Sequence, residues 1–284
     1  MILLTGVTGK TGGETAKQLL KKGAKLRALV RSADKASELK AAGVELVVGD
    51  IGDAEAVKRA LAGIEKAMLI LPNGRNQEAN EKQFTDLAKA AGVKHLVKMS
   101  SMEAVAHAKT PIPKAHWAVE EYIRGSGIPW TMVKPNFFMQ NLLSSAASIK
   151  SAQRFSLPMG NGTTGMADVR DIGVVGAEVL NGNGHIGKSY EITGPEVLTF
   201  HQVAEQFSAV LGVKIEYVPM PIDQFRERMK NILEPWHLDA VAQLFQEIAD
   251  IGLDHTTDTF RRLTGREPIS LRQFVQDHQA AFTA

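Results

Sequence analysis

Apolar and polar residues follow two different spacings along the first half of the chain. Short apolar runs are separated by longer segments in which apolar residues recur at helical spacing. The first apolar run, Ile2 to Leu4, stops at Gly6, and the segment from Lys10 to Lys22 has one apolar face. This stretch therefore predicts a strand, a glycine turn and a helix.

The same alternation continues downstream and predicts a parallel sheet. Further strands are expected at Lys25–Val30, Val44–Val48, Ala67–Leu71, His95–Met99 and Pro129–Val133, with helical segments between them. A parallel crossover needs a helix to return the chain, so helices should cover both faces of the sheet. The fold class expected is α/β, with a Rossmann-type doubly wound parallel sheet and a smaller interleaved C-terminal α+β region.

The second half of the chain predicts that smaller region. Helices are expected at about 168–180, 199–211, 222–233, 235–251 and 270–282, and a short strand at 215–218. We expect residues 1–153 to form an NAD(P)-binding core whose sheet is joined by the strand at 188–193. Residues 154–284 should mainly form a substrate-binding region that closes over the site.

The first turn predicts a site for an anion. Gly6, Gly9 and Gly12 are spaced so that a side chain would crowd the turn, an incoming phosphate or the contact between helix and strand. Backbone N–H groups and the positive end of the helix dipole both favour a pyrophosphate here. Thr8, Lys10 and Thr11 belong to the same turn. The alternative is a glycine turn that serves packing alone.

Arg31 follows the second strand and bears on the choice of cofactor. It lies where a dinucleotide-binding fold usually places an acid that holds the ribose 2′-hydroxyl. A guanidinium suits a 2′-phosphate instead, and Lys35 and Lys10 add positive charge nearby. NADP(H) is therefore expected in preference to NAD(H), although a solvated arginine at a strand end is the simpler alternative.

Further polar residues come at the ends of the later strands. Asp50 can accept a hydrogen bond from an adenine amine while Ile51 packs on the ring, although Asp50 can equally serve the start of the next helix. The loop formed by Leu71, Pro72 and Asn73 should run beside the riboses of the cofactor. Ser100 follows the fifth strand. Ligands of such sheets bind at the carboxyl ends of the strands, so these residues predict one crevice.

Composition and charge restrict the classes of partner. The 33 basic and 31 acidic residues leave a formal charge of +2, which is too balanced for a nucleic-acid surface. Cysteine is absent, which excludes disulfides and thiolate chemistry, and no metal-ligand set is expected. No apolar run approaches the roughly 18 residues of a membrane span. We expect a cytoplasmic protein that binds neither nucleic acid nor membrane.

Several motifs resemble those of a known family. TGVTGKTGG after the first strand, Arg31, GDI, the two serines from Ser100 and KPNFFMQN resemble the NmrA-like branch of atypical short-chain dehydrogenases. Within it the pattern is similar to triphenylmethane reductases and NADPH-dependent quinone oxidoreductases, with redox-sensing regulators as non-catalytic relatives. The resemblance implies that backbone groups around Pro135, Asn136 and Phe137 hold the nicotinamide carboxamide.

The sequence departs from the wider superfamily at the catalytic helix. Ser100 or Ser101 matches the serine of that superfamily, but His116 and Glu120 stand where a tyrosine and a lysine are usual. Residues four apart share a helix face, so Glu120 is expected to hydrogen-bond the His116 imidazole and orient it. His116 can then supply a proton after hydride transfer. The alternative is that both residues stand in the first turns of the helix and take no part in the chemistry.

These observations predict an NADPH-dependent oxidoreductase that passes a hydride to a small conjugated acceptor such as a quinone, a dye or an enone. Electron-poor acceptors need little help before the hydride arrives, which suits a site without the usual tyrosine and lysine. A non-catalytic NADP-binding regulator and a carbonyl or imine reductase are the alternatives. The expected partner is a small-molecule acceptor, and a homodimer stays open.

Overall fold

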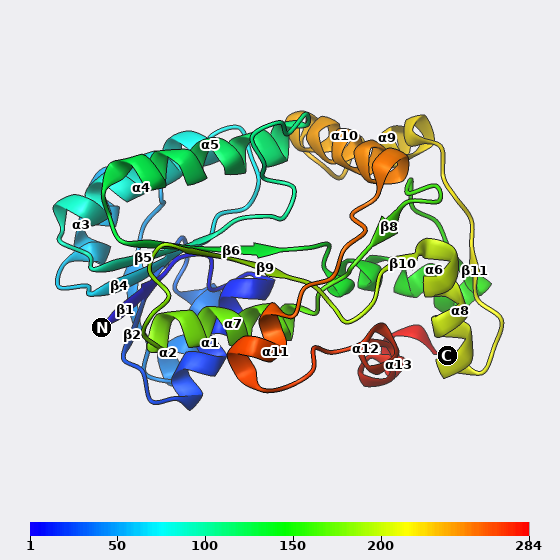
Figure 1. The fold of residues 1–284 in the computed structure, drawn as a ribbon, viewed down its shortest axis with the longest axis horizontal. Helices are drawn as coiled ribbons and strands as arrows, with labels where there is room; N and C mark the ends of the chain where they lie inside the picture. The colour runs from blue at the N-terminus through cyan, green and yellow to red at the C-terminus, as the bar shows by residue number, and fades with distance from the viewer. Residues whose placement is uncertain (284) are drawn as a thin grey trace. The chain divides into compact units, whose positions relative to one another are not determined.

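The computed structural model describes residues 1–283 and contains a seven-stranded sheet (Figure 1). Its strand order is β3-β2-β1-β4-β5-β6-β9. The strands are β1 (Ile2–Leu4), β2 (Leu26–Val30), β3 (Glu45–Val48), β4 (Lys66–Leu69), β5 (His95–Met99), β6 (Trp130–Pro135) and β9 (Lys188–Ile192). Neighbouring strands from β3 to β6 pair in parallel. The predicted α/β fold with a Rossmann-type parallel sheet is confirmed.

Helices cover both faces of this sheet. They are α1 (Lys10–Lys21), α2 (Ser37–Ala41), α3 (Ala54–Leu61), α4 (Gln77–Ala90), α5 (Pro111–Ser126) and α7 (Val169–Asn181). In Figure 1 α3, α4 and α5 run along one face, and α1 and α7 along the other. Apolar stripes of α3, α4 and α5 pack on strand residues such as Leu3, Leu69 and Leu96, all fully buried. Burial on both faces explains the nearly continuous apolar runs in the strands.

The chain divides into two compact units. The first contains residues 1–108, 113–134 and 169–191, and it holds most of the sheet. The second contains residues 109–112, 135–168 and the chain from 192 onward. Each unit has its own apolar core, as expected of structures that pack independently.

The second unit packs its helices and short strands around a core that contains several aromatic residues. Its elements are η2 (Met139–Ser145), α6 (Ala146–Ala152), β7 (Arg154–Phe155), β8 (Thr163–Thr164), β10 (Leu198–Thr199), α8 (Phe200–Leu211), β11 (Glu216–Tyr217), α9 (Ile222–Met229), α10 (Pro235–Ile251), α11 (Thr259–Thr264), α12 (Leu271–Asp277) and α13 (Gln279–Phe282). Phe155, Phe200 and Phe207 are almost completely buried in its core. Within residues 1–283, no helix has both the length and the apolar character required to cross a bilayer.

Three predicted helices differ from the observed ones. The helix expected at 222–233 ends four residues earlier, as α9. The helix expected after the second strand starts as a 3-10 turn, η1 (Asp34–Ala36), and continues as the short α2. The helix expected at 270–282 is interrupted at His278, which separates α12 from α13. Leu271, Phe274 and Phe282 are all buried, so the apolar pattern continues across the interruption. Side-chain spacing alone does not reveal such a break in the backbone.

A buried histidine ties β5 to β6 and to the segment before β9. The Nε2 atom of His95 lies 2.8 Å from Thr131 Oγ1, and this hydroxyl donates to the carbonyl oxygen of His185 at 2.6 Å. His95 must therefore be the donor to Thr131, because a hydroxyl has one proton. Burial, with lesser contributions from the charges of Lys66 and His185, lowers the pKa of His95 to about 4.

This histidine should make the fold sensitive to acid. An unfolded imidazole has a pKa of about 6.5. Between about pH 4 and 6.5, the unfolded chain therefore binds a proton at His95 that the folded chain does not bind. The stabilising contribution is complete above about pH 6.5 and is lost as the pH falls toward about 4. We expect the free energy of unfolding to decrease across this window in denaturant titrations, and His95→Gln to reduce the slope. His107→Gln, at an exposed position, is the control. An unchanged slope in His95→Gln would contradict the assignment.

Candidate cofactor and active site

The turn between β1 and α1 is so tight that no side chain fits at Gly6 or Gly12. Gly6 has a φ of +66°, and a Cβ on it would lie 2.8 Å from the carbonyl oxygen of Ile70. A Cβ on Gly12 would lie 2.3 Å from the carbonyl oxygen of Gly6. Helix α1 therefore begins directly on the turn. Two of the three predicted glycines are required by the backbone itself.

The start of α1 carries no negative charge of its own. Gly9 is the residue before the helix and supplies no side-chain cap, and the first turn of the helix has no acidic residue. Backbone N–H groups at a helix start and the helix dipole both attract an anion. The third glycine, Gly9, is exposed and leaves this end of the helix accessible. Thr8 and Lys10 are exposed beside it, whereas Thr11 is buried against the helix.

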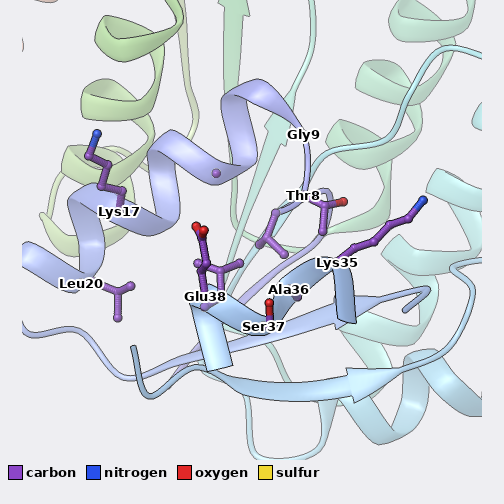
Figure 2. Close-up of a pocket in the computed structure, with 11 residues that line it drawn as sticks. Thr8, Gly9, Lys17, Leu20, Lys35, Ala36, Ser37 and Glu38 are labelled. Atoms are coloured by element: carbon purple, nitrogen blue, oxygen red, sulfur yellow. The ribbon is translucent and has the colours of Figure 1, made fainter. Parts of the chain in front are cut away.

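A pocket of about 660 Å³ opens beside this turn (Figure 2). Figure 2 shows Thr8 and Gly9 of the turn opposite Lys35, Ala36, Ser37 and Glu38, which follow β2. The lining is Val7, Thr8, Gly9, Gly13, Lys17, Leu20, Lys35, Ala36, Ser37, Glu38 and Leu39. The pocket thus brings together two segments that the sequence predicted to contact one nucleotide. Arg31 is exposed and does not belong to this lining.

The residues predicted after β3 and β4 lie at the same edge of the sheet. Asp50 is exposed, and its Oδ1 accepts a hydrogen bond from Gly52 N at 2.9 Å, so it closes a turn before α3. Ile51 and Leu71 are half-buried against the apolar core of the first unit. Pro72 is exposed, and Asn73 is half-buried. The side chain of Asn73 contacts His116 of helix α5, as described next.

His116 lies in a buried polar cluster. Its Nε2 is 3.2 Å from Asn73 Oδ1, and its Nδ1 is 3.1 Å from the Nζ of Lys98, which projects from β5. Lys98 also forms an ion pair with Glu81 of α4 at 2.8 Å, and both side chains are completely buried. Burial, and to a lesser extent the charges of Lys98 and Lys134, holds the pKa of His116 well below its usual value. His116 is therefore neutral near pH 7.

Ser100 and Glu120 form a second buried cluster. The Ser100 hydroxyl donates to Glu120 Oε1 at 2.5 Å. Lys134, from the end of β6, lies 3.1 Å from the same oxygen, and Arg124 donates to Oε2 at 2.6 Å. Glu120 is completely buried, so these partners offset the cost of placing its charge away from water.

The expected hydrogen bond between Glu120 and His116 is not formed among the described residues. Glu120 instead contacts Ser100, Lys134 and Arg124, and His116 contacts Asn73, Gln77 and Lys98. The spacing along α5 placed both side chains on one face correctly. It could not show that lysines from two different strands would separate them.

The remaining predicted residues belong to the second unit. Pro135 ends β6, and Asn136 Oδ1 accepts from the backbone N–H of Phe137 at 2.6 Å. Asn136 Nδ2 is buried without a partner among the described atoms. Phe137 is buried and packs edge-to-face on Phe200.

Sequence reasoning missed four charged residues of the two clusters. Glu81, Lys98, Arg124 and Lys134 were assigned no role, yet they contact the side chains predicted to be catalytic. One signal was available, because a lysine within an otherwise apolar strand of a parallel sheet must be buried and paired. Lys98 and Lys134 both stand in such strands.

Comparison with known proteins assigns the chain to a family. The NmrA-like family matches residues 1–265. The chain belongs to the NmrA-like family. It is 34% identical over 287 residues to the NAD(P)H azoreductase of Xenophilus azovorans, an alignment that covers 100% of both chains. The predicted family and the prediction of an NAD(P)H-dependent reductase are confirmed.

Solved structures of this NmrA-like fold agree with the comparison. The Escherichia coli NADPH-dependent quinone oxidoreductase, solved with NADPH, has a TM-score of 0.88 and 28% identity, over 98% of this chain and 100% of that one. The triphenylmethane reductase of a Citrobacter species has a TM-score of 0.87 and 26% identity, over 99% of each chain. An NAD(P)H cofactor fits the tight glycine turn, the uncapped start of α1 and the adjoining pocket.

The contact between Gly12 and Gly6 gives a direct test of the nucleotide site. Gly12→Ala places a methyl group 2.3 Å from a backbone oxygen, so α1 must move off the turn. We expect a loss of about 1 to 3 kcal/mol in unfolding free energy. NADPH affinity in calorimetric titration should fall as well.

Gly125→Ala is the matched control for this substitution. Gly125 lies within α5, and no atom would come within 4 Å of its Cβ. Alanine there should be neutral or stabilise the helix by up to about 1 kcal/mol, with unchanged NADPH affinity. Wild-type affinity in Gly12→Ala would contradict this placement of the pyrophosphate.

Proposed function

We propose that this NmrA-like protein is an NADPH-dependent reductase of small conjugated acceptors, of the quinone, azo-dye or enone type. One observation carries the proposal: the hydroxyl proton of Ser100 is donated to Glu120, and both ring nitrogens of His116 already lie within hydrogen-bond distance of other side chains. When bound, NADPH supplies a hydride. The nature of the acceptor then depends on how much acid assistance the protein can give.

Ser100 gives little assistance to a substrate oxygen. Its single hydroxyl proton is donated to Glu120, a buried carboxylate that two cations hold in place. An unactivated ketone needs a proton donor on its oxygen as the hydride arrives. Ser100 can donate to such an oxygen only by leaving Glu120, which has no other hydroxyl partner among the described residues.

His116 is equally occupied. A neutral imidazole has one N–H, and the ring contacts Lys98 on one nitrogen and Asn73 on the other. Burial and the charge of Lys98 oppose protonation, so the acidic imidazolium is not available near pH 7. Quinones, azo compounds and conjugated enones delocalise the incoming electron pair. Such acceptors can take their proton from water after hydride transfer.

The positive charges after β2 support a preference for NADPH over NADH. Arg31 and Lys35 are both exposed, and neither forms an ion pair among the described residues. Lys35 lines the pocket beside the glycine turn, and Arg31 lies four residues before it. A ribose 2′-phosphate is the part of NADPH that NADH lacks, and it would be attracted to both.

A regulator that binds NADP without turnover is the second candidate. The same internal hydrogen bonds of Ser100 and His116 suit a protein that binds the nucleotide and performs no chemistry. A carbonyl or imine reductase with His116 as the acid is a weaker alternative, because the ring is held neutral.

A panel of acceptors distinguishes these functions. We expect steady NADPH oxidation, followed by absorbance, with quinones, azo dyes and conjugated enones, and no turnover with saturated ketones or imines. Tight NADPH binding without turnover on any of these compounds would support the regulator instead. Turnover of saturated ketones that is lost in His116→Ala would support the carbonyl reductase.

Charge reversal at Arg31 tests the cofactor preference. In Arg31→Asp, a carboxylate repels the 2′-phosphate, so kcat/KM for NADPH should fall about tenfold to a hundredfold while that for NADH changes little. Arg59→Asp is the control, because Arg59 is an exposed arginine in the last turn of α3. Equal losses for both nucleotides in Arg31→Asp would show that Arg31 does not recognise the phosphate.

A further inference from the structure

The proposed chemistry leaves the buried ion pair of Lys98 and Glu81 without a role. Both side chains are completely buried, and their charged atoms are 2.8 Å apart. Such a pair rarely stabilises a fold more than apolar residues of the same size would, because both charges must leave water. A pair of this kind is better explained by what it holds in place. Its third member is His116.

The donors of Lys98 determine which nitrogen of His116 carries the proton. The ammonium group has three N–H donors and no acceptor. Its Nζ lies 2.8 Å from Glu81 Oε1, 2.6 Å from Met99 O and 3.1 Å from His116 Nδ1. Nδ1 must therefore accept a hydrogen bond. The single proton of the neutral ring lies on Nε2, which faces Asn73 Oδ1 at 3.2 Å.

Asn73 belongs to a loop that starts beside the glycine turn. The hydroxyl of Thr5 donates to Ile70 O at 2.9 Å and accepts from Ile70 N at 2.7 Å. Gly6 approaches the same carbonyl so closely that a Cβ there would lie 2.8 Å from it. The loop from Leu71 to Asn73 thus leaves the sheet next to the predicted pyrophosphate site. A fixed Asn73 would fix the wall of that site.

We propose that Lys98 is a positioning residue for nucleotide binding: it holds His116 as the Nε2–H tautomer, and His116 in turn holds Asn73 of the loop after β4. The assignment of the loop to nucleotide binding rests on the proposed function, whereas the tautomer does not. Gln77 Nε2 lies 3.3 Å from His116 Nδ1 and 3.4 Å from its Nε2, so this amide does not distinguish the two tautomers. Lys98 is the nearer donor and the charged one.

The tautomer can be measured directly in the full-length wild-type protein. We expect ¹⁵N NMR to show His116 with an unprotonated Nδ1 and a protonated Nε2 from about pH 6 to 8. A proton on Nδ1, or a ring that becomes charged in this range, would overturn the proposal. This measurement needs neither a variant nor a bound nucleotide.

A double variant then tests the role of Lys98. Lys98→Met with Glu81→Gln removes both buried charges together, which avoids leaving one of them unpaired. We expect the His116 signals to show mixed tautomers. The dissociation constant and KM for NADPH should rise about tenfold to a hundredfold, with a smaller change in kcat. An unchanged tautomer, or wild-type NADPH affinity, would overturn the proposal.

Lys66→Met provides a matched control. Lys66 is a lysine of the neighbouring strand β4 whose Nζ donates to the carbonyl oxygens of Leu180 and Gly182, at 2.7 and 3.2 Å. This variant should lose stability but keep the wild-type tautomer and NADPH affinity. If Lys66→Met changes the His116 tautomer and the NADPH affinity as much as the double variant does, the effect of the double variant is a general loss of stability and the proposal fails.

The two proposals fail in different ways. If the wild-type protein binds no nicotinamide nucleotide, the proposed function is wrong and Lys98 has no role in nucleotide binding. The wild-type NMR measurement still decides whether Lys98 sets the form of His116. If the protein binds NADPH but the double variant binds it equally well, the proposed function stands and the positioning role is wrong.

Discussion

The contact of Gly12 with the carbonyl group of Gly6 is the constraint on which the nucleotide site depends. It seats the first turn of α1 directly on the end of β1, so the free N–H groups of that turn face the edge of the sheet. The opposite side of α1 is held as closely, because a Cβ on Gly173 of α7 would lie 2.6 Å from Glu14 Cβ. The anion site is thus preformed by backbone packing, and no charged side chain is needed to shape it.

The sequence predicted the sheet well because burial on both faces leaves a strong signal. The strand expected at His95–Met99 has those bounds in the structure. The final helix was less predictable. Phe274 and Phe282 contact the same core, so apolar spacing continues although the backbone turns at His278. Spacing reports which side is buried and not whether the hydrogen-bond ladder is continuous.

The candidate site was predictable where the backbone alone determines it. Glycine spacing identified the turn, since no other residue fits there. The partners of Glu120 were not predictable, because its carboxylate is held by Ser100 and Lys134, which lie 20 and 14 residues away along the chain. Lys98 and Glu81 are 17 residues apart. Local spacing shows which side chains share a helix face, but tertiary packing decides which cation each one meets.

Helix α5 links the two buried clusters and couples stability to chemistry. His116 meets the lysine of β5, and Glu120, one turn later, meets the lysine of β6. Both strands lie side by side, so the two lysines approach the helix from neighbouring strands, with Lys98 level with Met132, two residues before Lys134. Hydrogen bonds and ion pairs within the protein offset much of the cost of burying these polar groups, although Glu81 Oε2 and Gln77 Oε1 have no partner among the described atoms. Under the proposed function, the same hydrogen bonds leave Ser100 and His116 little acid to offer a substrate. For the proposed reductase, a site stabilised in this way favours acceptors that need only a hydride from the protein-bound cofactor.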